Sequence, residues 1–103
     1  MGDVKDVPIR REETQGENNR PQAPALRLFS AFVDTDSNAL FVSSRYDVGG
    51  VSATIENTTT GDIYSYTFDS ADTALLPISC TGGLWSITLT LESGTKYVGE
   101  FYL

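Results

Sequence analysis

The sequence predicts an all-β protein, an immunoglobulin-like β-sandwich of about seven strands. Apolar residues alternate with Ser and Thr in several short runs, as in strands with one buried face. Clusters of Gly, Asn, Asp and Thr separate these runs at spacings of roughly 8–12 residues. No stretch has the period of an amphipathic helix, so two packed sheets are the expected architecture.

The C-terminal hairpin carries the clearest pattern. Apolar side chains fall on one side of an extended chain, and hydroxyl side chains (Ser86, Thr88, Thr90) fall on the other. The apolar set is Trp85, Ile87, Leu89 and Leu91. Gly94 suits the positive φ of a short hairpin loop. The returning strand carries Tyr97, Phe101 and Leu103 on its apolar side.

Five further strands are expected before this hairpin. They cover 26–33, 40–46, 51–56, 63–68 and 75–79, and turn-forming residues separate them. These strands and the hairpin place the sandwich domain at 25–103. Residues 1–24 are polar, contain three prolines and lack aromatic residues, which indicates a flexible tail. Within it, 7–11 could form a short edge strand, where proline is tolerated.

The charge of the chain excludes several function classes. The formal net charge is −7, with four basic and five acidic groups in 1–24 and three basic and nine acidic groups in 25–103. Such a surface repels phosphate backbones and anionic lipids, so no nucleic acid partner is expected. The chain has no run of about 18 apolar residues, so no direct membrane insertion is expected. Its start lacks the apolar core of a signal peptide, which leaves a cytoplasmic protein or one with a removed export signal.

The sequence contains little that suggests catalysis. It has no histidine, which excludes imidazole-based mechanisms, and most of its carboxylates lie at predicted turns. Asp34, Asp36 and Asn38 resemble the start of a calcium loop, but Ala39 and Arg45 stand where such a loop needs Gly and Glu. We therefore expect a plain turn there and no enzyme activity, metal or cofactor.

Cys80 is the single cysteine in the chain. It is interpreted as a partly buried apolar residue near a strand end.

Aromatic residues give the only candidate binding residues. Tyr64, Tyr66 and Phe68 alternate along one strand, and Trp85 lies in a neighbouring strand. Aromatic rows can stack on sugar rings, although in a small sandwich they more often fill the core. Tyr64 and Tyr66 are the candidates for ligand contact because their hydroxyls need water or a partner. The triplet that starts at Asn57 matches an N-glycosylation site but is interpreted as a turn.

The end of the chain resembles a family of small exported immunoglobulin-like proteins of unknown function from Gram-negative gut anaerobes. The resemblance is carried by the short strand 75–79, the glycine-led strand 82–89 and the terminal strand 93–101 with its Gly-x-x-Tyr-x-Gly-x-Phe spacing. It implies an exported protein whose signal segment has been removed. It implies no catalytic or binding residues.

Export would give meaning to two triplets, Asp69–Ala71 and Asp72–Ala74. They resemble the O-glycosylation sites that such bacteria use on exported proteins, which makes Ser70 and Thr73 candidate modification sites. The alternative is a polar loop with two chance triplets.

The expected function is a non-catalytic exported or cell-envelope module that binds an unidentified protein or glycan. Its contact surface would be a hydroxyl-rich sheet face or the loops 47–50, 57–62 and 69–74. The alternative is a structural or assembly protein that pairs sheet edges or donates its N-terminal strand to a partner. The oligomeric state stays open, and a secreted, periplasmic or cell-surface location follows from the resemblance alone.

Overall fold

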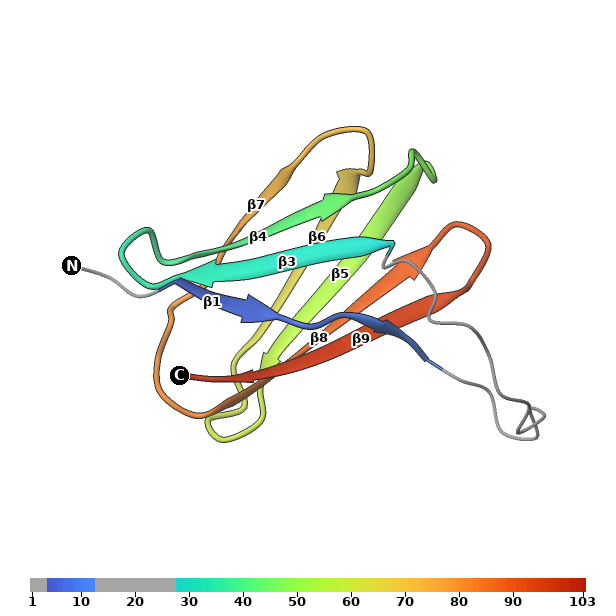
Figure 1. The fold of residues 1–103 in the computed structure, drawn as a ribbon. Coiled ribbons are helices and arrows are strands. Elements are labelled where there is room, and N and C mark those ends of the chain that lie inside the picture. The colour runs from blue at the N-terminus through green and yellow to red at the C-terminus, as the bar shows by residue number, and fades with distance from the viewer. Residues whose placement is uncertain (1–3, 13–27) are drawn as a thin grey trace, which may run out of the picture.

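The protein is a β-sandwich in the computed structural model, which describes residues 4–12 and 28–103 (Figure 1). A four-stranded sheet with the order β1-β3-β4-β7 packs against a five-stranded sheet with the order β2-β9-β8-β5-β6. All neighbouring strands are antiparallel. Across these residues no helix is long and apolar enough to span a bilayer. The all-β prediction is confirmed.

The strands between 28 and 103 are the seven that the sequence predicts. They are β3 (Phe29–Asp34), β4 (Ala39–Ser44), β5 (Gly50–Asn57), β6 (Ile63–Asp69), β7 (Ala74–Pro77), β8 (Leu84–Leu91) and β9 (Lys96–Tyr102). Predicted and observed ends differ by a few residues. The predicted first strand starts at residue 26. Its first two residues, 26 and 27, lie outside the described ranges.

The core lies between the two sheets and is made by alternate residues of each strand. The period-two pattern of β8 holds, since Trp85, Ile87 and Leu89 are all at most 1% exposed. The opposite sheet supplies the alternate residues of β3 and β4, namely Phe29, Ala31, Val33, Leu40 and Val42. Complete burial of such a side chain contributes about 1.5–3 kcal/mol, so this alternation accounts for much of the driving force for the fold.

The N-terminal residues add two strands to this sandwich. β1 (Val4–Val7) pairs with β3, and β2 (Arg10–Arg11) pairs with β9 of the other sheet. Pro8 lies between them, where its missing N–H removes no ladder hydrogen bond as the chain changes sheet. Val7 and Ile9 on either side of it are 1% and 5% exposed.

Residues 4–12 thus lie in the two sheets, whereas the sequence indicated a tail with at most an edge strand over 7–11. The composition of this stretch is polar, but its two apolar side chains are spaced so that both reach the core. The other residues of the predicted tail, 1–3 and 13–24, lie outside the described part of the chain.

Gly99 permits the chain to change sheets at Pro8. A Cβ atom at Gly99 would lie 2.5 Å from the Pro8 carbonyl oxygen and 2.8 Å from Ile9 Cδ1. We expect Gly99→Ala to lower the free energy of unfolding by about 1–3 kcal/mol, because the backbone of Pro8 must shift to admit the methyl group. Gly82→Ala is the matched control, since its Cβ would meet only the Leu103 carbonyl oxygen at 3.4 Å. Urea unfolding compares the two, and equal stabilities would contradict the steric argument.

Candidate functional site

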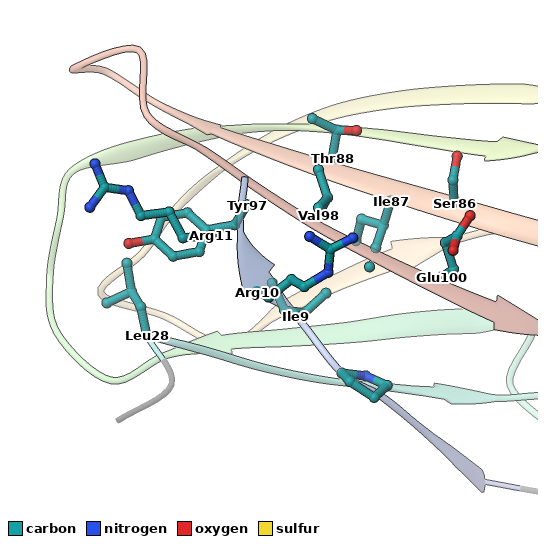
Figure 2. A pocket seen from close by; sticks show the side chains of 12 residues that line it. Ile9, Arg10, Arg11, Leu28, Ser86, Ile87, Thr88, Tyr97, Val98 and Glu100 are labelled. Carbon is teal, nitrogen blue, oxygen red and sulfur yellow. The ribbon is translucent and has the colours of Figure 1, made fainter. Parts of the chain in front are cut away.

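A groove of about 790 Å³ runs beside β2 and β9 at one edge of the five-stranded sheet (Figure 2). We call it the β2–β9 groove. Its polar lining consists of Arg10, Arg11, Ser86, Thr88, Tyr97 and Glu100. Its apolar lining consists of Pro8, Ile9, Leu28, Ile87 and Val98 together with the backbone of Gly99. The groove therefore combines cations, hydroxyl groups and an apolar floor.

Strand pairing brings this lining together from distant parts of the sequence. Arg10 lies opposite Val98, and Arg11 lies opposite Tyr97. On the other side of β9, Thr88 lies opposite Val98. Directly opposed residues in a sheet share a face, so Arg10, Val98 and Thr88 form one row across three strands. The groove thus depends on β2, which the sequence treated as part of a possible edge strand in a tail.

The aromatic wall of the groove is fixed from the core side. The half-buried Tyr97 ring packs edge-on against Phe29, with 5.1 Å between ring centroids and 77° between planes. Figure 2 shows the Arg11 side chain beside the Tyr97 ring, as their opposed positions in β2 and β9 require. A fixed aromatic wall beside a guanidinium group is suited to holding a polar ligand with one flat apolar face.

The charge of the groove differs from that of the whole chain. Arg10 and Arg11 are both exposed and both line it, and Glu100 is the single carboxylate among its described lining residues. Lys96 adds a third cation on the same face of β9 as Val98, and the exposed Glu12, whose N–H donates to the Lys96 carbonyl oxygen, adds a second carboxylate beside it. Sequence analysis could not find this cluster of cations, because Arg10–Arg11 and Lys96 are 85 residues or more apart in the chain. Sheet pairing thus gathers three cations and two carboxylates at this edge, a small local excess of positive charge on a chain of net charge −7.

Hydroxyl groups extend from the groove across the outer face of the five-stranded sheet. Thr88 lies opposite Thr54, which in turn lies opposite Ser65. The neighbouring row joins Thr90, Ser52 and Thr67 in the same way. The sequence predicted hydroxyl-rich strand faces, and the register aligns them into two rows, of which the Thr88 row begins at the groove.

The two tyrosines predicted to bind a ligand lie elsewhere, on β6 at the opposite edge of the sheet. Both rings are half-buried and pack against the core. Tyr64 stacks on Trp85 with 6.2 Å between centroids, and the Tyr66 hydroxyl donates a hydrogen bond to the Pro77 carbonyl oxygen. The inner faces of both rings therefore contribute to the core, which is the more common role of aromatic rows in a small sandwich. Contact of Tyr64 or Tyr66 with a ligand stays a prediction, and neither lines the β2–β9 groove.

The two predicted modification sites have different environments. Ser70 is 3% exposed; its hydroxyl accepts a hydrogen bond from Val48 N at 2.7 Å and contacts the Gly49 carbonyl oxygen at 2.8 Å. That hydroxyl is thus a structural link between two turns and is poorly accessible to a transferase. Thr73 is exposed. A glycan stays a prediction, and the burial of Ser70 directs it to Thr73.

The remaining motifs have local structural roles. The Asp34 carboxylate accepts hydrogen bonds from Asp36 N and Ser37 Oγ, which is the plain turn expected there. Within the described ranges no three His, Cys, Asp or Glu side chains gather in a way that could hold a metal ion. The Asn57 side chain is fully buried and bonded to its own turn, as that interpretation of the triplet requires.

Cys80 is half-buried against the core with a positive φ of 52°. Burial, and then the nearby charge of Asp34, raise the pKa of its thiol above the ordinary value. The reactive thiolate is therefore disfavoured, which fits the interpretation of Cys80 as a small apolar residue.

A solved structure shares this arrangement over almost the whole chain. It is a DUF3244 family protein from Bacteroides vulgatus, described as an immunoglobulin-like β-sandwich, with a TM-score of 0.69 over 98% of this chain and 99% of that chain. The fold is an immunoglobulin-like β-sandwich. The prediction of that fold is confirmed. At 13% sequence identity the likeness shows the fold and carries no residue assignment.

The comparison agrees in part with the resemblance of the C-terminal third, since the similar protein comes from a gut anaerobe and belongs to a family of unknown function. No family model matches this sequence. No curated protein matches it either. The site must therefore be interpreted from its own chemistry.

Proposed function

We propose that this protein is a non-catalytic interaction module of the cell envelope that binds an acidic glycan in the β2–β9 groove. The carrying observation is that Arg10 and Arg11, at successive positions of β2, both line a groove whose other lining is hydroxyl groups, apolar surface and the single carboxylate of Glu100. Guanidinium groups form charge-assisted, often bidentate hydrogen bonds with carboxylates. A sugar acid supplies such a carboxylate together with hydroxyl groups.

The rest of the lining favours a sugar chain over a smaller anion. Ser86 and Thr88 can donate to and accept from sugar hydroxyls, and the Glu100 carboxylate can accept from them. The half-buried Tyr97 ring offers apolar surface to the C–H face of a sugar ring, and Val98 offers a second apolar contact on the other face of β9. The hydroxyl row that leaves the groove at Thr88, through Thr54 to Ser65, provides a path for further sugar units across the sheet.

Binding without catalysis is supported by the composition of the groove. Glycoside hydrolysis in most enzymes needs two carboxyl groups flanking the bond, and the described lining holds only Glu100. The chain also has no histidine to serve as a general acid or base. Location at the cell envelope is supported by the resemblance of the C-terminal third to exported proteins.

The alternative role as a strand-donating assembly protein has weaker support. β1 pairs with β3 of its own chain over four residues, and Val7 is buried in its own core. Donation of this strand to a partner would expose Val7 and Ile9 and would break that pairing.

Removal of either guanidinium tests the proposal. Arg10→Ala and Arg11→Ala should each weaken binding of a galacturonic acid hexasaccharide by at least about tenfold, since a charge-assisted hydrogen bond is worth more than the 1.4 kcal/mol that corresponds to tenfold. Isothermal titration calorimetry measures the affinity. Arg45→Ala is the control, because its guanidinium lies outside the groove, 5.9 Å from the Tyr46 ring centroid.

A neutral galactose hexasaccharide should bind much more weakly than the acidic one. Equal affinity for the two sugars would argue against carboxylate recognition. Equal losses in the Arg45 variant would show a general charge effect instead of a site. Tight binding of an acidic peptide in place of the sugar would overturn the glycan assignment.

A further inference from the structure

The four sheet edges of this sandwich are protected to different degrees. The four-stranded sheet ends in β1 and β7, and the five-stranded sheet ends in β2 and β6. β1, β2 and β7 have four, two and four residues, whereas β6 has seven. Natural sheets protect their edges from pairing by short strands, charged residues and proline. Length alone therefore sets β6 apart.

Residue types separate the edges further. β1 contains Lys5 and Asp6, β2 consists of Arg10 and Arg11, and β7 ends at Pro77. The residues of β6 before Asp69 include neither a charge nor a proline and are rich in aromatic and β-branched types, namely Ile63, Tyr64, Ser65, Tyr66, Thr67 and Phe68. An edge of this composition has a high tendency to pair with another strand. β6 is thus the unprotected edge of the described sandwich.

The backbone of β6 directs a regular set of hydrogen-bonding groups away from β5. Hydrogen bonds from Asn57 N to the Asp62 oxygen and from Ser70 N to the Gly49 oxygen close the two ends of the β5–β6 ladder. In an antiparallel pair only alternate residues bond to the partner strand. The parity set by these two bonds leaves the N–H and C=O groups of the odd-numbered residues Ile63, Ser65 and Thr67 on the outer side. Among the described strands, none pairs with β6 on that side.

Side chains at this edge also offer surface to a further strand. The inner-face residues Tyr64, Tyr66 and Phe68 are half-buried, although the corresponding residues of the central strands β5 and β8 are almost fully buried. Figure 1 shows β6 as the last strand of its sheet, next to β7 of the opposite sheet. A strand added beside β6 would cover the remaining surface of these three rings if its inward residues were apolar.

Charge at the two ends of β6 indicates which strand fits. Asp62 precedes β6 and Asp69 ends it, and both are exposed. Antiparallel pairing with a second copy, centred on Tyr66, would place Asp69 of one chain opposite Ile63 of the other, one position from its Asp62, so that each end of the pair would hold two carboxylates and no cation. Neighbouring like charges destabilise a strand pair, whereas opposite charges stabilise it. A strand with basic residues at both ends avoids this repulsion and complements a chain of net charge −7.

We propose that β6 is a docking edge for an extended segment of another protein, with alternating apolar residues in its centre and a Lys or Arg at each end. The segment would extend the five-stranded sheet by one strand, with backbone hydrogen bonds to Ile63, Ser65 and Thr67. This edge is at the opposite end of the sheet from the β2–β9 groove, so the two surfaces act separately.

The test uses a capped seven-residue peptide in which three valines alternate with two threonines between terminal lysines. Nuclear magnetic resonance titration of the protein should show new hydrogen-exchange protection at the Ser65 and Thr67 amides. The same peptide with terminal glutamates should bind at least about tenfold more weakly, because both end pairs change from attractive to repulsive. Asp62→Lys should reduce this difference, whereas Asp36→Lys, the same charge change in a turn outside β6, should not.

Ser65→Pro removes one outward N–H at a position where an edge strand tolerates proline, and it should abolish peptide binding while the far-ultraviolet dichroism spectrum is retained. If the Ser65 variant does not fold, the comparison of Asp62→Lys with Asp36→Lys decides whether the peptide binds at β6. Equal binding of the two peptides, or no protection at Ser65 and Thr67, would overturn the proposal. A concentration-dependent dimer with Ser65 protected in the absence of peptide would also overturn it and would identify the occupant as a second copy.

Discussion

Trp85→Ala is expected to lower the free energy of unfolding by about 3–5 kcal/mol, a large part of the stability of a small domain. The side chain is fully buried and lies between two other rings. Its centroid is 6.2 Å from that of Tyr64 on β6 and 6.0 Å from that of Phe101 on β9. Truncation would leave a cavity that touches three strands of the five-stranded sheet, and these rings cannot close it without leaving their own partners.

The indole N–H contributes separately from the ring volume. It donates a hydrogen bond to the Thr81 carbonyl oxygen at 2.8 Å and so holds the loop before β8. Trp85→Phe keeps most of the packing and loses this bond, so its cost should be clearly smaller than that of Trp85→Ala. Trp85 is the only tryptophan, so neither variant has tryptophan fluorescence to report unfolding. Urea unfolding is therefore followed by far-ultraviolet dichroism. Equal costs for the two variants would contradict the assignment of most of the effect to ring packing.

The alternation of residues in the C-terminal hairpin predicted which face of its first strand is buried, because that information is local. Trp85, Ile87 and Leu89 were assigned to the core from their spacing, and all three are there. The loop at Gly94 was predicted in the same way, from the φ value that a short hairpin requires, and its φ is 93°. Each of these features depends on neighbours within a few residues.

The groove could not be predicted because it depends on contacts across the chain. Arg10 and Arg11 face Val98 and Tyr97 only because the chain changes sheets at Pro8 and because Gly99 leaves room for it. The polar composition of residues 1–24 indicated a tail, since the two apolar side chains Val7 and Ile9 change the average hydrophobicity of this stretch very little. The signal that could have found the strand is their spacing around Pro8, followed by two arginines suited to an exposed edge.

The exposure of single hydroxyl and tyrosine side chains also depends on contacts with distant parts of the chain. Ser70 lies in a polar loop and has a residue type that is usually exposed, yet the turn at Val48 and Gly49 covers it. Tyr64 and Tyr66 lie on the inner face of an edge strand, so they are neither fully buried nor presented as a flat platform. Alternation gives the face of a residue, whereas the position of its strand in the sheet decides how much of it stays exposed.

Asn57→Ala is expected to lower the free energy of unfolding by about 2–4 kcal/mol, because it removes a fully buried amide whose partners would be left unsatisfied. Its Oδ1 atom accepts hydrogen bonds from Thr59 N at 2.9 Å and Thr60 N at 3.2 Å. Its Nδ2 atom donates to Thr81 Oγ1 and to the Gly82 carbonyl oxygen, both at 3.2 Å. One side chain thus joins the turn after β5 to the loop before β8.

Thr58→Ala is the matched control, since the Thr58 hydroxyl makes one hydrogen bond, to the Leu84 carbonyl oxygen, in an exposed position. Its loss should cost about 0.5–1.5 kcal/mol. Chemical denaturation measures both variants, and hydrogen exchange should show the Thr59 and Thr60 amides opening in the Asn57 variant alone. Because the same loop holds the Trp85 N–H through Thr81, the Asn57 and Trp85 substitutions share a partner segment and should be non-additive. Strict additivity in the double variant would show that the two side chains stabilise the loop independently.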